Sequence, residues 1–209
     1  MKRPPDISIS RLAVYSRFLE GYKKEKGSKS TINSEELARF LDMNPHQIRK
    51  DLSYFGKFGE RGLGYRTQDL RDKINRILGL GKRWNLCLFG MGNLGSALFA
   101  YRGFKEIDLN IVAIFDNDAK KIGRSIQGVK IYSPKSIASV VKKLNIGIAI
   151  IAAPQAAAQD ITDRLVKSGI RAVLNFAPIK LNVPRSVKLR NVDLSTELIH
   201  LVYFLSSRE

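Results

Sequence analysis

The sequence predicts an α/β chain built from two parts, and three observations support this prediction. Two short helical patterns meet at a tight turn near residue 44, a glycine loop follows a buried strand near residue 90, and strand and helix patterns alternate beyond it. A chain of 209 residues can hold two small domains. We expect an N-terminal helical domain over 1–80, an alternating α/β domain over 84–190 and a C-terminal helix over 193–207.

The composition is strongly basic. The chain has 36 Lys and Arg against 19 Asp and Glu, a net charge of +17, which points to a polyanionic partner. The excess is spread evenly, so charge alone does not locate the binding surface. No apolar stretch has the length of a bilayer span, and the basic start is not followed by the apolar segment of a signal peptide. With Cys87 as its single cysteine, we expect a cytoplasmic protein and no membrane partner.

The segment before residue 56 has the features of a helix-turn-helix. "TINSEELARFLD" begins with a capping box of Asn33 and Glu36, and "MNPHQIRKDLSYF" has Asn44 as a cap and Pro45 at its first helical position. At about 100° per residue, the apolar side chains of the second helix face inward. The side chains expected to point outward are those of His46, Gln47, Lys50, Ser53 and Tyr54, with Arg49 on the flank.

Four glycines around Arg61 in "GKFGERGLGY" predict a tight hairpin after this helix, the pattern of a wing. A helix-turn-helix with a wing is a winged-helix domain, whose second helix can enter the major groove of double-stranded DNA. The DNA-contacting residues would be Gln47, Lys50 and Ser53 at base edges with Tyr54 beside them, Arg61 in the minor groove, and Arg49 and Lys57 at phosphates. The alternative is a small helical bundle whose charges form a solvated face.

The stretch "NLCLFGMGNLGSALFAY" reads as strand, glycine turn and helix, the start of a Rossmann-type dinucleotide-binding domain. Gly90 permits the turn, Gly92 lets the backbone approach a pyrophosphate, and Gly95 lets the helix pack against the strand. A second strand ends in Asp116, 21 residues past Gly95, where a carboxylate can accept ribose hydroxyls and repel a 2′-phosphate. NAD(H) is therefore favoured over NADP(H), although Lys120, Lys121 and Arg124 follow closely and could bind such a phosphate.

The remaining chain continues the alternation. "PKSIASVVKKL" and "AAAQDITDRLVKSG" read as helices, and "IGIAIIAAP" and "RAVLNFAP" as strands, which predicts a parallel, doubly wound sheet. Ala153 and Pro154 follow a strand end, where ligands bind in such sheets. The last segment, "NVDLSTELIHLVYFLSSRE", has almost no polar face, so its helix either caps its own sheet or is buried against another chain.

The sequence offers little catalytic equipment, so we expect the protein not to be an enzyme. Its two histidines, His46 and His200, lie on the expected DNA helix and the terminal helix, and too few residues follow the last expected strand for a substrate domain. One cysteine and two scattered histidines match no zinc spacing, and we expect no metal. A basic reader domain joined to a dinucleotide domain suggests a switch that couples nucleotide to DNA occupancy.

Read whole, the chain resembles the Rex family of redox-sensing transcriptional repressors over nearly its full length. The resemblance rests on "ISRL", "SEELA", "QIRKDLSYFGKFGERGLGY", "ILGLGKRW", "GMGNLGSAL", "IFDND", "GIRAVLNFAP" and "NVD". It implies a homodimer with N-terminal winged helices, C-terminal Rossmann domains and a C-terminal swapped helix. Such a repressor binds an inverted-repeat operator when NADH is scarce and leaves it when NADH binds, controlling respiratory and fermentative genes.

The resemblance also assigns residues. Arg17, Tyr101 and Asp193 would link the two states of the dimer, and Leu194 stands where some members carry a phenylalanine near the nicotinamide. The site for NADH and NAD⁺ would comprise Gly90, Met91, Gly92, Asn93, Leu94, Gly95, Tyr101, Asp116, Ala153, Pro154, Asn175, Phe176 and Asp193. A pocket of apolar groups such as Phe176, Leu194 and Tyr101 would disfavour the charged, oxidised ring.

Two other functions remain open from the sequence. A small NAD-dependent oxidoreductase with an accessory helical domain would turn over a substrate and would not bind DNA sequence-specifically. A regulator that binds CoA or ADP would use a similar glycine loop and bind CoA more tightly than NADH. Nucleotide titrations and a DNA-binding assay separate the three.

Overall fold

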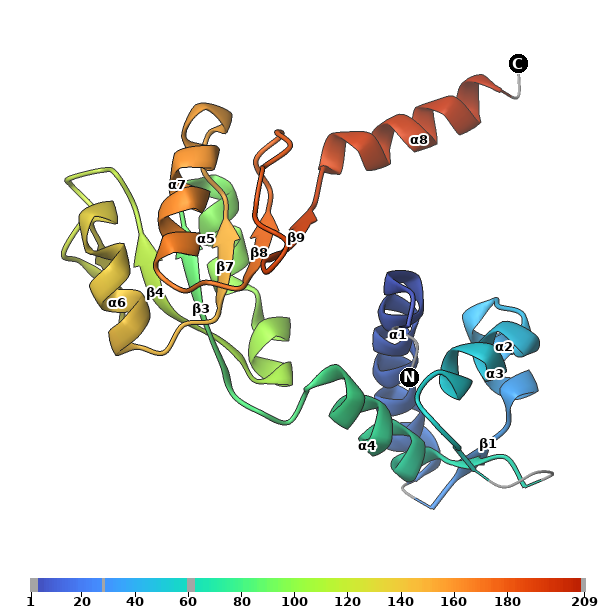
Figure 1. Cartoon of the computed structure of the whole chain (residues 1–209). Coiled ribbons are helices and arrows are strands. Elements are labelled where there is room, and N and C mark those ends of the chain that lie inside the picture. The colour runs from blue at the N-terminus through green and yellow to red at the C-terminus, as the bar shows by residue number, and fades with distance from the viewer. Residues whose placement is uncertain (1–3, 28, 60–62, 208–209) are drawn as a thin grey trace. The chain divides into compact units, whose positions relative to one another are not determined.

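The computed structural model describes residues 4–27, 29–59 and 63–207, and the chain divides into two compact units, Met1–Lys82 and Arg83–Glu209 (Figure 1). The N-terminal unit packs four helices around one core: α1 (Asp6–Lys26), α2 (Ser34–Leu41), α3 (Pro45–Ser53) and α4 (Thr67–Leu78). Leu12, Tyr15 and Leu19 of α1 are fully buried in that core, as their spacing on one helical face requires.

The predicted helix starts of the helix-turn-helix are confirmed. Asn33 and Glu36 form the capping box of α2, each accepting a hydrogen bond from the backbone N–H of the other. Asn44 caps α3 by accepting from the backbone N–H of His46, and Pro45 occupies the first turn. These local bonds fix where α2 and α3 begin.

The turn of the expected wing hairpin, residues 60–62, lies outside the described residues. The base of the wing is a two-stranded antiparallel sheet in which β2 (Tyr65–Arg66) pairs with β1 (Thr31–Ile32), a segment that precedes α2. Gly59 and Gly64 both have positive φ, and a Cβ on Gly59 would come within 2.3 Å of the Gly64 carbonyl oxygen. Only glycine fits this close approach. β1 was not predicted from the sequence because its partner residues lie 33 and 35 positions further along the chain.

The C-terminal unit is built on a seven-stranded sheet in the order β5-β6-β4-β3-β7-β8-β9. Its strands are β3 (Trp84–Phe89), β4 (Leu109–Phe115), β5 (Ser125–Ile126), β6 (Val129–Tyr132), β7 (Ile148–Ile151), β8 (Ala172–Asn175) and β9 (Lys188–Asn191). All neighbours are parallel except β5 and β6, which confirms the parallel sheet. The strands β5, β6 and β9 were not predicted from the sequence because they are short or strongly polar.

Helices cover both faces of this sheet, as expected of a doubly wound fold (Figure 1). Cys87 and Phe89 of β3 lie in one apolar cluster with residues of α6 (Ile137–Lys143) and α7 (Gln155–Lys167). Leu86 and Leu88 point to the other face, in a cluster with α5 (Asn93–Ala100) and the short 3₁₀ helix η1 (Arg102–Ile107). A second 3₁₀ turn, η2 (Pro134–Ser136), leads into α6. Alternate burial on both faces places β3 at the centre of the unit.

The terminal helix α8 (Leu194–Ser206) is not packed on the sheet (Figure 1). Its large apolar side chains are 58–73% exposed, and they are Leu194, Leu198, Ile199, Leu201, Val202, Tyr203, Phe204 and Leu205. An apolar surface of this extent is unusual on an isolated chain. Of the two arrangements left open by the sequence, the helix is therefore not a cap on its own sheet.

Candidate functional site

The glycine loop between β3 and α5 has the geometry of a phosphate-binding turn. Gly90 has a φ of +92°, and a Cβ there would lie 2.5 Å from the Ala152 carbonyl oxygen. A Cβ on Gly95 would lie 1.9 Å from the Gly90 carbonyl oxygen, so α5 packs against the loop only because this residue is glycine. These two predicted roles are confirmed by the local geometry.

Gly92 differs from its two neighbours. A Cβ there would meet no atom within 4 Å, and its φ of −82° suits any residue. Nothing in the chain around it therefore requires glycine. The open space lies at the N-terminal end of α5, where unpaired N–H groups face outward and favour an anion. The loop thus fits a pyrophosphate that approaches the backbone closely.

The carboxyl ends of three neighbouring strands close around this loop. Gly90 N–H donates to the Phe115 carbonyl of β4 at 2.8 Å, and Ala152 N–H donates to the Phe89 carbonyl of β3 at 2.8 Å. The N–H of Phe176 reaches the Ile151 carbonyl of β7 at 2.9 Å in the same way. Because these strands are parallel, the residues that follow them, including Ala153 and Pro154, lie at one edge of the sheet.

The remaining predicted loop residues differ in exposure. Met91 is buried and packs with the α5-side cluster, whereas Asn93 and Leu94 are exposed in the first turn of α5. Phe176 is half-buried in the same cluster as Met91. The site therefore combines a polar, open loop with an apolar floor.

Asp116, at the end of β4, is buried and ties the loop to its own turn. Its Oδ2 accepts the backbone N–H of Met91 at 2.8 Å, and its Oδ1 accepts the N–H of Asp118 at 2.8 Å. Burial opposes ionisation, but the N–H groups of Asp118 and Met91 and the Lys121 ammonium outweigh it, so the pKa of Asp116 is lowered. The carboxylate stays charged and can accept further hydrogen bonds.

The side chain of Asn175, predicted in the cofactor site, forms its hydrogen bonds within its own part of the chain. The side chain is fully buried at the end of β8, and its Oδ1 accepts the N–H of Ala177 at 2.9 Å. Its Nδ2 lies within 3.0–3.1 Å of the Ala177 and Ile179 carbonyls and of Asn191 Oδ1. These bonds hold the loop that carries Phe176, so the contribution of Asn175 is to shape the site.

The three predicted switch residues are all exposed. Arg17 lies on the outer face of α1 in the N-terminal unit. Tyr101 is 57% exposed, stacks edge-on to Phe104 with ring centres 5.1 Å apart, and lies so close to Gly103 that a Cβ there would come within 2.6 Å. Asp193 caps α8, accepting the backbone N–H of Ser195 at 2.9 Å.

The outward face of α3 is partly as predicted. Lys50 and Ser53 are exposed, Tyr54 at the helix end is half-buried, and Lys57 beyond it is exposed. Gln47 is not directed outward. It is half-buried, and its Nε2 donates to Asp51 Oδ1 at 3.0 Å, because Asp51 lies one helical turn away on the inner side. Lys50 and Ser53 are therefore exposed as predicted, and so is His46.

Arg49 is held on the flank of α3 by the start of α2. Its Nη1 donates to Ser34 Oγ and to Glu35 Oε1, both at 2.7 Å. The hydrogen bonds from its own backbone and from Arg49 lower the pKa of Glu35. The guanidinium is half-exposed, so it can still approach a phosphate, but Glu35 offsets its charge.

Asp51 was not predicted from the sequence, although its side chain accepts more hydrogen bonds than any other among the described residues of the N-terminal unit. Its fully buried carboxylate accepts hydrogen bonds from Ser8 Oγ at 2.8 Å, Arg11 Nε at 2.5 Å and Nη2 at 2.7 Å, and Tyr15 Oη at 2.8 Å. Burial opposes its ionisation, but Arg11 and the two hydroxyls outweigh that effect and lower the pKa of Asp51. Since Ser8, Arg11 and Tyr15 all lie on α1, this carboxylate fixes α3 to α1.

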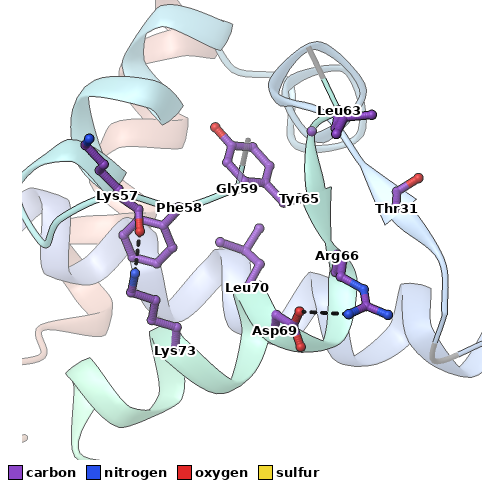
Figure 2. A pocket seen from close by; sticks show the side chains of 11 residues that line it. Thr31, Lys57, Phe58, Gly59, Leu63, Tyr65, Arg66, Asp69, Leu70 and Lys73 are labelled. Atoms are coloured by element: carbon purple, nitrogen blue, oxygen red, sulfur yellow. Dashed lines mark hydrogen bonds and ion pairs between the residues drawn. The ribbon is translucent and has the colours of Figure 1, made fainter. Parts of the chain in front are cut away.

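Figure 2 shows how the wing is anchored to α4. The Lys73 ammonium donates to the Lys57 carbonyl and lies 4.3 Å from the centre of the Phe58 ring. Arg66 pairs with Asp69 at 3.8 Å on the opposite side of a hollow of about 740 Å³. Arg61, predicted to enter the minor groove, lies outside the described residues.

Two features are absent from the residues that the structure describes. No group of three or more His, Cys, Asp or Glu side chains among these residues could hold a metal ion. None of the helices described is both long and apolar enough to cross a bilayer.

Family models match both units. One described as "CoA binding domain" matches residues 81–179, and one described as "Putative DNA-binding protein N-terminus" matches residues 5–53. Curated relatives named "Redox-sensing transcriptional repressor Rex" match almost end to end. The relative from Desulforamulus reducens is 48% identical over 98% of this chain and 97% of its own, and that from Pelotomaculum thermopropionicum is 46% identical over 98% and 95%.

Solved structures match equally fully. The crystal structure of RSP in complex with beta-NAD+ and operator DNA is 36% identical, with a TM-score of 0.94, over 100% of this chain and 95% of that chain. The crystal structure of RSP in complex with beta-NADH is 35% identical, with a TM-score of 0.88, over 100% and 97%. The two units of the present chain therefore occur together, in the same order, in these relatives.

Proposed function

Because the chain belongs to the Rex family of redox-sensing transcriptional repressors, we propose that it is a homodimeric, DNA-binding repressor that responds to the NADH/NAD⁺ ratio. The N-terminal unit would bind an inverted-repeat operator and the C-terminal unit would bind the dinucleotide. NADH would release the operator. The observation that carries the proposal is the glycine loop between β3 and α5, where Gly90 and Gly95 bring the backbone close and no described atom lies within 4 Å of the Cβ position of Gly92.

The dinucleotide would lie along the carboxyl edge of the sheet. The loop from Gly90 to Gly95 would hold the pyrophosphate and Asp116 would accept the adenosine ribose hydroxyls. When bound, the nicotinamide supplies the signal, because only its oxidised ring carries a positive charge. Half-buried Phe176 offers an apolar wall that disfavours that charge.

DNA recognition would centre on α3. Exposed Lys50 and Ser53 would reach base edges in the major groove, while Arg49 and Lys57 would neutralise phosphates and Arg61 would approach the minor groove. Asp51 supports this arrangement because it holds α3 against α1 through a buried charge. The helix would then meet the groove as part of a rigid unit.

The dimer would form through α8. The exposed apolar side chains of this helix favour a second copy of the chain as the surface that buries them, consistent with a helix swapped onto the partner. Two α3 helices related by the dimer axis would meet two half-sites, so the operator would be an inverted repeat. Exposed Tyr101, Arg17 and Asp193 would then change partners between the two states of the dimer.

The switch needs a difference in affinity between the two dimer shapes. A full exchange of bound and free populations requires about 5.5 kcal/mol of preference by NADH for the released shape. The protein would catalyse no reaction, in keeping with relatives that are named repressors, and would act in the cytoplasm where the dinucleotide pool lies.

The match to a CoA-binding family model favours one second candidate, a regulator whose ligand is CoA or ADP. NADH, CoA and ADP share an adenine, a ribose and a pyrophosphate, so the glycine loop suits each of them. Asp116 suits the free ribose hydroxyls of NADH and ADP, whereas it would repel the 3′-phosphate that CoA carries on this ribose. The nicotinamide end distinguishes them. Tighter binding of CoA than of NADH would favour this candidate.

Fluorescence anisotropy of a labelled inverted-repeat DNA from upstream of the gene for this chain tests the proposal at fixed salt. Tight binding that NADH abolishes, and that NAD⁺ and CoA leave intact, is the expected result. DNA binding indifferent to both dinucleotides would replace redox sensing with another ligand. Failure to bind this or a related operator would contradict the repressor role.

A further inference from the structure

Lys121 lies in the turn that follows Asp116 and is bonded to the dinucleotide loop itself. Its Nζ donates to the Met91 carbonyl at 3.0 Å and to Asp116 Oδ2 at 3.3 Å, and it lies 4.0 Å from Asp118 Oδ2. The side chain is only 37% exposed. Lys121 therefore bridges the backbone of the glycine loop and the carboxylate expected to meet the ribose.

Three hydrogen bonds within residues 116–121 hold the turn that carries Lys121. Asp118 N–H donates to Asp116 Oδ1, Lys120 N–H donates to Asp118 Oδ1, and Lys121 N–H donates to the Asp118 carbonyl, all within 2.8–2.9 Å. The hydrogen-bonded backbone of this turn thus positions the Lys121 ammonium beside Asp116. A cation at this place in a Rossmann unit is the kind of group that accommodates a 2′-phosphate.

Asp116 and Lys121 therefore have opposite effects on the choice between NADH and NADPH. The carboxylate favours a free 2′-hydroxyl and repels a 2′-phosphate, whereas the ammonium would attract that phosphate. In the structure the ammonium is bonded to the carboxylate, which is buried and charged. Its own charge is largely neutralised there, so little of it is left for a phosphate.

We propose that Asp116 and Lys121 form a selector pair in which the carboxylate binds the ribose and also withholds the Lys121 ammonium from a 2′-phosphate. NADH is then accepted and NADPH refused by one ion pair. Lys121 acts as a positioning residue, because its bond to the Met91 carbonyl also holds the glycine loop. This inference rests on the dinucleotide binding proposed above.

Calorimetric titration of NADH and NADPH into the full-length dimer tests the pair. The unaltered protein, Asp116→Asn, Lys121→Met and the double variant are compared by the ratio of the two dissociation constants. In Asp116→Asn the preference for NADH over NADPH, expressed as the ratio of dissociation constants, should fall by about tenfold or more. This is the contribution of one charge-assisted hydrogen bond from the Lys121 ammonium to the 2′-phosphate. Adding Lys121→Met should restore most of the lost preference.

Lys121→Met alone keeps the test decisive if Asp116→Asn fails to fold. Removing the ammonium leaves the repulsion of Asp116 unopposed, so the preference for NADH should rise. The matched control is Lys120→Met, which removes the same charge one residue away. Added to Asp116→Asn, it should leave the ratio of the two dissociation constants as it is in Asp116→Asn alone.

Three results overturn the selector. The first is a ratio of dissociation constants in Asp116→Asn equal to that of the unaltered protein. The second is a double variant whose ratio equals that of Asp116→Asn. The third is a change of the ratio in Lys120→Met as large as that in Lys121→Met. If the unaltered protein binds neither dinucleotide, the proposed function itself fails. That outcome is distinct, because it appears before any variant is compared.

Discussion

The hydroxyl of Tyr15, on α1, donates a hydrogen bond of 2.8 Å to the fully buried carboxylate of Asp51, on α3. Thirty-six residues separate the two in the chain. Burial and the neighbouring carboxylate raise the pKa of Tyr15, so the hydroxyl keeps its proton and remains a donor. The helix that would read DNA is in this way bonded to the helix that carries Arg17.

Replacing Asp51 by Asn should loosen this attachment strongly. The amide keeps the shape but leaves the Arg11 guanidinium, 20% exposed, without its buried counter-charge, which costs about 3–5 kcal/mol. Hydrogen exchange should then rise across α1 and α3, and operator affinity should fall. Tyr15→Phe is the milder control, since it removes one hydroxyl at about 1 kcal/mol. Exchange and affinity unchanged in Asp51→Asn would show that α3 is held by apolar packing alone.

Gly92→Ala and Gly95→Ala form a matched pair in the glycine loop. The Cβ at Gly92 meets no atom within 4 Å, so the melting temperature should stay close to that of the unaltered protein. Its NADH affinity should fall roughly ten- to a hundredfold, because the methyl occupies the place of the ligand. Gly95→Ala should instead lower the melting temperature, since its Cβ meets the Gly90 carbonyl oxygen at 1.9 Å. Full NADH affinity in Gly92→Ala would place the ligand elsewhere.

Glu35→Gln should make DNA binding less selective. Arg49 would lose its 2.7 Å carboxylate partner and its full charge would face the DNA. Affinity for unrelated DNA should rise, and the slope of log affinity against log salt should steepen by up to about one unit, the contribution of one phosphate contact. Glu25→Gln, an exposed acid paired with Lys26, controls for net charge. Equal effects of both substitutions would mean that Glu35 has no specific role.

Placing Glu at Leu198 and Leu205 should break the dimer. The two side chains are 63% and 73% exposed on one chain, and burial against a partner would stabilise the dimer by about 2 kcal/mol for each. Light scattering should report a monomer, and operator affinity should fall because a monomer reads one half-site. Glu197→Gln, on the same helix, should leave the dimer intact. A dimer that survives both substitutions would exclude α8 as its interface.

The elements that local patterns govern were predictable from the sequence. Capping residues placed α2 and α3, and the Gly90–Gly95 spacing placed the nucleotide loop between β3 and α5. The short strand β1 was not, because it depends on a partner distant in the chain, and β9 was not, because its sequence is short and polar.

The polar network was the least predictable part of the candidate site. A helical wheel places Gln47 outward, but it cannot report that a buried acid one turn away accepts its amide. Asp51 carried no signal of its own, since its three donors on α1 lie 36–43 residues away. Asn175 is the opposite case. It is a polar residue at a strand end, where a ligand contact is expected, but its side chain forms hydrogen bonds with neighbouring residues of the chain.

The central claim is that the dinucleotide and operator sites are coupled, and coupling between binding sites is reciprocal. The most direct test is the affinity of the protein for NADH, measured by titration with and without saturating operator DNA at one salt concentration. The account predicts that operator weakens NADH binding by the same factor by which NADH weakens operator binding. An NADH affinity that is identical in the two conditions would contradict it.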